Sequence, residues 1–430
     1  MFLRRIELEN VRSIEHLEID FNSEGEATRR WTILLGENGT GKSSVLRSIA
    51  LITAGSAALS ELLLKPDSWV RLGTQSCRIA ADLVTADGEE RQISLAWSRG
   101  QNIRDLFEQN KMTLDQLDSA LAHSTRSYFT VGYGASRRLG SARFASQTFD
   151  SNQHRRARNV ATLFSNDAVM NPLDTLAMDL EYRKSKQGFE IVRETMSEIL
   201  PGVKISRIDR DKRELLFETP DGELPLDQLS DGYQNMAGWC GDLLYRITDA
   251  YEDYKNPLKA RGLLLVDELD LHLHPVWQRL LKQFLKEKMP NLQILATTHS
   301  PLTAQEAGEN ELYFLRRSGE TGASELEQYI GAPNKLFTHQ VLLSPAFGFD
   351  TVNSKKVEDM RDTYEMLKSR GEKNLNKKEK TELRRLDDEL GDIPDWSRET
   401  EQDKKQFAVL EKIEAALGSN GNNRNGGGTV

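Results

Sequence analysis

Residues 36–43 read Gly-Glu-Asn-Gly-Thr-Gly-Lys-Ser, and this stretch decides the fold. It fits the pattern G-x-x-x-x-G-K-[ST], in which a glycine-rich loop surrounds phosphate groups. A short apolar run at 31–35 precedes the loop, and apolar residues at helical spacing follow it over 43–51. The order strand, glycine loop, helix is the setting that this pattern requires. The sequence therefore predicts an α/β fold that binds a nucleotide through its phosphates.

Each position of the loop has a chemical reason. Glycines allow backbone N–H groups to turn toward phosphate oxygens, and the Lys42 ammonium is placed to reach the β- and γ-phosphates. The Ser43 hydroxyl is suited to be a ligand of Mg²⁺. The predicted nucleotide-binding residues are Gly36, Glu37, Asn38, Gly39, Thr40, Gly41, Lys42, Ser43 and Ser44.

A second motif supplies two carboxylates. Residues 262–268 read Gly-Leu-Leu-Leu-Val-Asp-Glu, an apolar strand that ends in an adjacent acid pair. Asp267 is the predicted second ligand of Mg²⁺, and Glu268 is the predicted catalytic group that orients or deprotonates water. A buried strand with a polar end would explain the apolar residues but not the adjacent acids. The pair therefore favours hydrolysis over binding alone.

Two further segments flank the acid pair in the sequence. Leu-Ser-Asp-Gly-Tyr-Gln at 229–234 precedes a predicted helix, so the Ser230 hydroxyl and the Gly232 amide would meet phosphate oxygens. In isolation, such a serine is more often a helix N-cap without a ligand. Asp231 and Gln234 complete the predicted binding residues of this segment.

The second segment is Thr-Thr-His-Ser-Pro at 297–301, which ends the strand after the next helix. This position places His299 at the edge of the sheet, where it would touch the γ-phosphate. A lone histidine is usually structural, but its place after the acid pair makes His299 the second predicted catalytic residue.

The composition excludes several classes of protein. The chain has 430 residues, 38% of them apolar, which is enough for two or three domains with a sizeable core. Its formal charge of −9 argues against a basic surface, so any contact with nucleic acid would be local. Two distant cysteines, Cys77 and Cys240, suit a reducing compartment. We see neither a signal peptide nor a long apolar span, and expect a cytoplasmic protein without membrane contact.

Changes in the pattern divide the chain into five predicted parts. The N-terminal lobe holds the phosphate loop and an antiparallel β subdomain, and a second lobe holds the later motifs. Between them lie an arginine-rich excursion, expected to be flexible over 134–159, and a helical insertion. Helices and a disordered Gly/Asn tail end the chain. The five parts are 1–133, 134–202, 203–350, 351–417 and 418–430.

In this order, the motifs resemble the ABC-type ATPase heads of the SMC, RecF and OLD superfamily, over roughly residues 1–350. The opening Glu-Leu-Glu-Asn-Val-Arg-Ser at 7–13 is similar to the first strand of that group, where the arginine approaches the nucleotide, so Arg12 joins the predicted binding residues. Asp-Glu-Leu-Asp-Leu-His-Leu-His-Pro at 267–275 resembles the AAA-21 subgroup of bacterial defence-associated ATPases. That subgroup includes PtuA-like proteins of Septu and retron systems and AriA-like proteins. Residues 133–139 and 342–350 look like further marks of it.

The resemblance implies a P-loop NTPase fold of the ABC-type head with an antiparallel β subdomain, a helical insertion and a C-terminal helical region. It implies that two heads enclose two ATP molecules with Mg²⁺, each bound by the loop of one protomer and the Ser230 segment of the other. Several charge-assisted hydrogen bonds per site, each worth about 1.5 to 3 kcal/mol, would be lost on hydrolysis. ATP would thus hold a homodimer or a higher homo-oligomer together.

No nuclease motif is visible in this chain, and residues 351–430 are too short and too helical for the nuclease domain of OLD proteins. A separate effector, such as an HNH-type nuclease, is therefore expected in antiphage defence. Three alternatives differ. A RecF- or SMC-like ATPase of DNA repair would bind DNA itself, and a transporter ATPase would carry a glutamine loop and a membrane-coupling surface. A degenerate binding module conflicts with intact Lys42, Asp267 and Glu268.

Six arginines gather over 131–160, and two interpretations of them stay open. A mobile loop with these charges would grip a nucleic-acid backbone, whereas a solvated loop or a partner-binding face explains the same composition. Arg137 and Arg138, near the strand end, would instead sense the nucleotide. The six are Arg137, Arg138, Arg143, Arg155, Arg156 and Arg158.

Other details stay open as well. Asp231 stands where transporter signatures commonly have a glycine. His272 and His274 with Asp270 would form a metal site in an alternative interpretation, although they alternate beside the opposing ATP site. No glutamine loop is assigned; the candidates are Gln75, Gln92 and Gln101.

Overall fold

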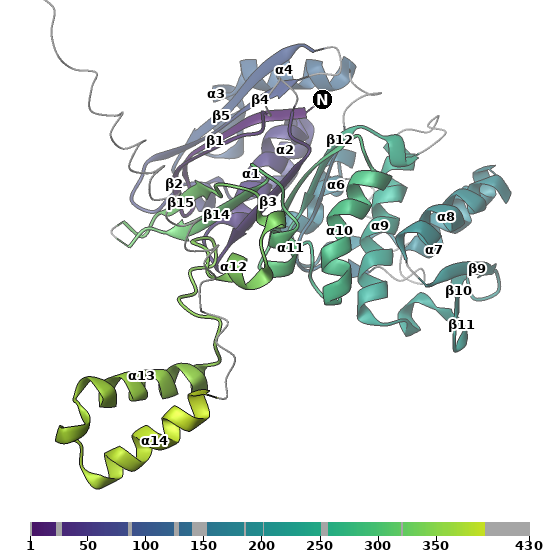
Figure 1. Ribbon diagram of the computed structural model, residues 1–430. Helices are drawn as coiled ribbons and strands as arrows, with labels where there is room; N and C mark the ends of the chain where they lie inside the picture. Colours follow the sequence, from purple (N-terminus) through teal and green to yellow (C-terminus); the bar gives the residue numbers. More distant parts are fainter. Residues whose placement is uncertain are drawn as a thin grey trace, which may run out of the picture. The chain divides into compact units, whose positions relative to one another are not determined.

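The structure is a computed structural model that describes residues 2–22, 28–84, 88–123, 129–139, 153–184, 186–200, 202–250, 257–319 and 321–391. The chain divides into two compact units, Met1–Phe347 and Gly348–Val430. All the nucleotide-binding and catalytic residues predicted above belong to the first unit (Figure 1).

The described residues of the first unit form a ten-stranded sheet whose two halves differ in strand direction, in the order β5-β4-β1-β2-β15-β14-β3-β13-β12-β6. One half is antiparallel and consists of β5 (Glu90–Ser98), β4 (Ser76–Val84), β1 (Phe2–Val11) and β2 (Ile14–Asp20). The other half is parallel and consists of β14 (Leu312–Arg317), β3 (Trp31–Gly36), β13 (Leu292–Thr298), β12 (Gly262–Val266) and β6 (Thr130–Tyr133). Between the halves, β15 (Ser324–Gln328) is antiparallel to β14 and parallel to β2. The predicted α/β fold is confirmed.

The parallel strands are buried on both faces because their apolar runs are continuous. Successive side chains of a strand point to opposite faces, so Leu34 enters one hydrophobic cluster while Ile33 and Leu35 enter another. The first cluster includes residues of α1 (Lys42–Ala54), α2 (Ser56–Leu62) and α6 (Arg155–Phe164). The second includes residues of α7 (Leu173–Lys184), α8 (Lys186–Ile199), α9 (Asp231–Ala250) and α10 (Pro275–Lys288).

Helix α1 contacts both halves of the sheet. It meets β1, β4 and β5 of the antiparallel half and β3, β12 and β13 of the parallel half. The sheet therefore curls around the helix that begins at the phosphate loop (Figure 1).

Helix α6 corrects one prediction, because residues 155–159 were expected to be flexible and instead begin a helix. Its buried face consists of Ala157, Val160 and Leu163, at spacings of three residues. A Cβ atom on Gly132 of β6 would lie 2.3 Å from Leu163 Cδ1, so the glycine permits this close packing. Arginines between the apolar positions hide the helical pattern in the sequence. Residues 140–152 of the excursion lie outside the described residues.

Smaller elements complete the first unit. A three-stranded antiparallel sheet and a two-stranded parallel pair form two further sheets, separate from the main one. Short helices belong to the same unit. They are β9 (Lys204–Asp209), β10 (Glu214–Thr219), β11 (Gly222–Pro225), β7 (Arg138–Leu139), β8 (Val169–Met170), α3 (Ile103–Gln109), α4 (Lys111–His123), α11 (Pro301–Gln305) and α12 (Thr338–Leu342).

The second unit contains α13 (Lys355–Ser369) and α14 (Lys377–Gly391). Leu367 and Leu386 are buried, as their three-and-four spacing predicts, and Leu375 of the connection is buried with them. The rest of the predicted C-terminal helices and the tail fall at 392–430, outside the described residues. Across the described part of the chain, no helix combines the length and the apolar character needed to cross a membrane.

Candidate nucleotide site

The phosphate loop lies between the end of β3 and the start of α1. Lys42 is the first residue of α1, and its Nζ donates hydrogen bonds to the carbonyl oxygens of Gly36 (2.7 Å) and Glu37 (2.9 Å). Gly41 has φ of 101°, and a Cβ atom there would lie 2.9 Å from Ser13 Oγ. The turn between β1 and β2 therefore rests against the loop.

Lys42 is a nearly buried cation, with 6% of its surface exposed. Burial lowers the pKa of its ammonium, and the charges of Glu268, Asp267 and Glu37 act in the opposite direction. The strand order β3-β13-β12 brings the loop lysine to the edge of the sheet where the acid pair lies, although the two are far apart in sequence. A buried ammonium between a glycine loop and carboxylates is suited to bind phosphate oxygens.

Thr297 on β13 holds both acids at the end of β12. Its hydroxyl donates to Asp267 Oδ1 (2.6 Å) and accepts from the Glu268 backbone N–H (2.8 Å). The Asp267 N–H donates to the Tyr133 carbonyl on β6 (2.8 Å). Strands on either side of β12 thus fix the point where the acid pair leaves the sheet.

Glu268 and His299 face each other across this edge. Glu268 Oε1 lies 3.3 Å from His299 Nε2, a close approach without the alignment of a hydrogen bond. The backbone of Glu268 is left-handed, with φ of 52°, which is unusual for a residue other than glycine. The two predicted catalytic residues are therefore neighbours, held by two adjacent parallel strands.

Arg12 lies in the turn that rests on the loop. Its guanidinium stacks over the Trp69 ring, 4.2 Å from the centroid, and its backbone is left-handed with φ of 53°. Burial, with repulsion from Arg47 of α1 as a second cause, lowers the pKa of Arg12 to about 10. Arg12 thus lies near Arg47 of α1 and stacks on Trp69 of the same N-terminal lobe.

The Ser230 segment forms the start of α9, as expected, but it does not meet the phosphate loop. Ser230 is exposed, and in the part of the chain that the structure describes no hydrogen bond joins it to residues 36–44. The Gln234 amide donates to the carbonyls of Asp227 (3.1 Å) and Leu229 (2.7 Å), so it shapes the turn. Asp231 is exposed, and Gly232 lies against the His272 carbonyl.

A buried polar network ties the body of α9 to β6. Asp242 on α9 accepts hydrogen bonds from the Tyr133 hydroxyl (2.8 Å), from the Asn171 backbone N–H (2.7 Å) and from Arg246. Arg246 also donates to Asn159 Oδ1 on α6 (3.1 Å). Nearer its start, α9 donates from Asn235 to the Leu271 carbonyl (2.6 Å), in the loop after the acid pair. The helix that presents Ser230 is therefore fixed to the acid-pair region of its own protomer.

The oxygen ligands expected for Mg²⁺ suit that ion. Ser43 is half-buried in the first turn of α1, and Asp267 keeps one carboxylate oxygen that receives no hydrogen bond from the described residues. A hydroxyl and a carboxylate, with phosphate oxygens and waters, form the hard oxygen set that Mg²⁺ prefers. The donor chemistry of the chain therefore fits the ion.

The alternative metal site at 270–274 is not assembled. The Thr298 hydroxyl donates to Asp270 (2.6 Å), and His274 Nδ1 accepts from the Val276 N–H as the N-cap of α10. His272 is exposed. Asp270 and His274 thus bond to different neighbours.

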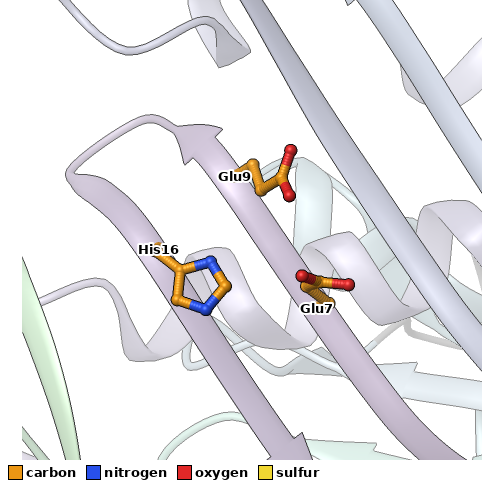
Figure 2. A group of neighbouring side chains, drawn as sticks. All are labelled: Glu7, Glu9 and His16. Carbon is orange, nitrogen blue, oxygen red and sulfur yellow. The ribbon is translucent and has the colours of Figure 1, made fainter.

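One group with metal-ligand chemistry does occur among the described residues, on the outer face of β1 and β2. Figure 2 shows Glu7, Glu9 and His16, whose ligand atoms lie within 4.8 Å of one another. Arg78 approaches Glu9 (3.1 Å) and Glu7 (3.7 Å), and Arg5 approaches Glu7 (3.2 Å). These cations already compensate the carboxylates.

The arginines of the excursion do not form one cluster. Arg138 approaches Asp167 (3.7 Å) across the β7 and β8 region, and Arg155 pairs with Asp249 (3.1 Å). Arg156 and Arg158 share α6 with Arg155, and Arg143 lies outside the described residues.

Arg137 is placed at the acid pair. Its guanidinium donates to the carbonyl oxygens of Asp267 (3.0 Å) and Glu268 and to that of Gly134 (3.3 Å). Burial lowers its pKa to about 10, with the carboxylates of the acid-pair loop opposing, so it stays charged at neutral pH. The sequence grouped it with its neighbours because adjacent arginines look alike in composition.

The candidate glutamines lie at the other end of the sheet. Gln92 belongs to β5, and Gln75 and Gln101 flank the β4–β5 hairpin, whereas β6 and β12 form the opposite end. None of the three therefore neighbours the acid pair in strand order. The loop that follows β6, by contrast, leaves the sheet next to the acid pair.

A family model described as "AAA domain, putative AbiEii toxin, Type IV TA system" matches residues 32–304. The Septu protein PtuA of Bacillus mycoides (strain KBAB4) is 28% identical over 90% of this chain and 50% of its own length. The Septu protein PtuA of Bacillus thuringiensis is 27% identical over 73% of this chain and 76% of its own. This chain thus spans about half the length of the first relative. The SMC head domain from Thermotoga maritima aligns with 76% of this chain and 99% of its own at 16% identity, with a TM-score of 0.42.

Proposed function

The chain belongs to the AAA-domain family whose model matches residues 32–304, and from that membership we propose that it is an ATP-hydrolysing head that dimerises around ATP and regulates a partner effector. The effector we propose is a nuclease that acts in antiphage defence. The similarity to the two Septu PtuA proteins supports the defence setting.

One observation carries the catalytic part of the proposal. Lys42, Glu268 and His299 come from widely separated parts of the sequence and meet where β3, β12 and β13 end. The carboxyl ends of neighbouring parallel strands form one edge of the sheet, where ligands of open α/β sheets bind. The 3.3 Å separation of Glu268 and His299 and the Coulomb interaction of Lys42 with both acids support a single site.

The residues have distinct tasks in this proposal. Lys42 and the N-terminal amides of α1 hold the β- and γ-phosphates of ATP. Glu268 orients and deprotonates the water that attacks the γ-phosphate, and His299 stands beside it at the same edge. Asp267 and Ser43 would hold Mg²⁺, which neutralises phosphate charge when it is bound.

The position of Ser230 supports the proposed dimer, because no hydrogen bond among the described residues joins it to the phosphate loop of its own protomer. Ser230 is exposed at the start of a helix of 20 residues, with the positive end of the helix dipole beside it. We propose that this helix start completes the ATP site of a second copy. Asn235 fixes α9 to the loop after the acid pair, and Asp242 fixes it to β6. Binding of this helix start to the second copy's ATP would therefore also shift the acid pair of its own protomer.

The test compares ATP turnover and size of the wild-type protein with those of Glu268→Gln. We expect Glu268→Gln to bind ATP, to lose turnover by about 10²- to 10⁴-fold and to accumulate as a dimer with ATP. Lys42→Ala is the control that loses ATP binding and therefore stays monomeric. Equal turnover of wild type and Glu268→Gln would refute the catalytic assignment, and an unchanged size with ATP would refute the dimer.

The effector is tested separately. Products of the neighbouring genes are expressed with this chain, and nucleic-acid cleavage is measured with ATP and with a non-hydrolysable analogue. A nuclease whose activity depends on the bound nucleotide is expected. ATP-dependent DNA binding by this chain alone, without such a nuclease, would instead favour the DNA-repair alternative.

A further inference from the structure

The loop that follows β6 reaches the catalytic edge of the sheet. Strand β6 is parallel to β12 and pairs with it from Thr130 to Tyr133, opposite residues 263–266. After Tyr133, the Asp267 N–H continues this ladder by donating to the Tyr133 carbonyl (2.8 Å). The loop 134–137 therefore leaves the sheet beside the acid pair.

Arg137 fastens this loop to the backbone around Glu268. Its Nη2 donates to the Asp267 carbonyl oxygen (3.0 Å) and to the Glu268 carbonyl oxygen. The first carbonyl belongs to the peptide group that precedes the Glu268 Cα atom, and the second to the one that follows it. One guanidinium therefore holds both peptide groups that set the backbone of Glu268.

That backbone needs support. Glu268 has φ of 52°, a left-handed conformation that brings the Cβ atom of an L-residue too close to a carbonyl oxygen of the backbone. Surroundings that hold both adjacent peptide groups maintain such a conformation. Among the described hydrogen bonds, the Glu268 N–H is held by Thr297 and the Asp267 carbonyl by Arg137. The Glu268 carbonyl is held by Arg137 together with the Leu271 N–H (3.1 Å).

The positive charge of Arg137 also stabilises the acid-pair region. Asp267, Glu268 and Asp270 lie within its Coulomb range. Carboxylates in one region repel one another, and the positive charge of Arg137 opposes that repulsion. Arg138, the next residue, has no part in this arrangement, because its partner is Asp167 (3.7 Å) and its side chain is 62% exposed.

We propose that Arg137 is a positioning residue for ATP hydrolysis: by binding both carbonyls around Glu268 it fixes the backbone that aims the catalytic carboxylate. It acts through Glu268 and not through the nucleotide. The inference rests on the proposed hydrolysis of ATP by this site. It gives Arg137 a task different from contact with nucleic acid.

The experiment uses the full chain and measures kcat, KM and ATP affinity for Arg137→Gln, with Arg138→Gln as the matched control. A misplacement of about 1 Å at a catalytic group can cost about 10²-fold in rate, so we expect kcat of Arg137→Gln to fall by about that factor. KM and ATP affinity should stay near wild type, because phosphate binding by Lys42 is untouched. Arg138→Gln should keep the wild-type kcat.

A double-variant cycle separates positioning from general damage. If Arg137 acts through Glu268, then Arg137→Gln should not lower the residual turnover of Glu268→Gln any further. Independent damage would multiply the two losses, and that result would overturn the proposal. A folded Arg137→Gln protein with wild-type kcat would overturn it as well.

Arg137→Lys covers the case in which Arg137→Gln does not fold. Lysine keeps the charge but lacks the rigid fork of donors, so we expect a folded protein whose kcat lies below that of wild type. A wild-type kcat for this variant would overturn the role of the two carbonyl bonds. Absence of ATP turnover in the wild-type protein would be a different result, since it would remove the proposed function itself.

Discussion

Glu268 Oε1 and His299 Nε2 lie 3.3 Å apart, although the two residues follow different strands of the parallel half of the sheet. The contact exists because β12 and β13 are neighbours in register from Gly262 to Val266. Both side chains are about one-third exposed. The pair is therefore already assembled within a single chain.

His299→Ala should lower kcat while KM and ATP affinity stay near wild type. The histidine stands beside the proposed base, and removing a positioned group of this kind costs about 10²- to 10⁴-fold in rate. Steady-state turnover and nucleotide binding give the two values. His16→Ala, an exposed change on β2, is the control and should leave kcat unchanged. If both variants keep wild-type turnover, His299 has no catalytic task.

Thr297→Val should lower both stability and turnover. The Thr297 hydroxyl donates to Asp267 Oδ1 and accepts from the Glu268 N–H, and Thr297 is fully buried. Leaving a buried donor and acceptor unpaired costs about 1–3 kcal/mol in the free energy of unfolding. Thr297→Ser keeps the hydroxyl and should recover most of the turnover. Urea denaturation and ATP turnover are measured for both, and equal results for valine and serine would contradict the assignment.

Asp242→Ala should strongly destabilise the first unit. It leaves the Arg246 charge buried without its partner, and breaking such a pair costs about 3–5 kcal/mol. Asp249→Ala, on the same helix, removes an exposed pair with Arg155 and should change stability by no more than about 1 kcal/mol. Thermal and urea unfolding of both variants provide the comparison. A similar loss in both would mean that burial of the pair is unimportant.

Asp174→Asn should make the protein more stable at neutral pH. Burial raises the pKa of the Asp174 carboxyl, with the charges of Glu214 and Asp227 contributing. The contribution of a group whose pKa is raised by folding is present below its unfolded pKa and is lost as pH rises through its folded pKa. Asparagine keeps the oxygen that accepts from the Leu215 N–H (2.7 Å in the wild type).

The measurement for Asp174→Asn is urea denaturation across the pH range from about 4, the unperturbed value for aspartate, to 7. The advantage of the variant over wild type should grow with pH. Asp211→Asn, an exposed change in the turn between β9 and β10, is the control. An advantage that does not depend on pH would contradict the prediction.

The sequence predicted those parts of the fold that have a strong local pattern. The apolar runs before Gly36 and Asp267 became the buried strands β3 and β12, because a parallel strand covered on both faces needs a continuous apolar run. The helix after Lys42 followed from its apolar spacing. The strands β14 and β15 were not predicted, although Leu312 to Leu315 are buried, because a short run of this kind does not distinguish a strand from a helix.

The candidate site was predicted less completely. Motif positions predicted Lys42 and Glu268, but the place of Arg137 depends on strand order, since only the pairing of β6 with β12 brings it to the acid pair. Gln234 stays a prediction as a nucleotide-binding residue; in the structure its amide also donates to two carbonyls of its own turn, which the sequence did not reveal. The spacing of residues in a motif does not reveal which backbone carbonyls will need a side-chain donor in the folded protein.

The position of β3 sets the order of events while the protein is being made. This strand spans Trp31–Gly36 near the start of the chain, yet both of its neighbours, Leu292–Thr298 and Leu312–Arg317, are synthesised much later. Pairing over such long sequence separations is slow, and apolar segments that wait for it are exposed to aggregation. The phosphate loop therefore emerges early from the ribosome but acquires its final surroundings only when residue 317 has followed it. A translation product cut short before that point would carry the whole phosphate-binding motif without the strands that hold it in place.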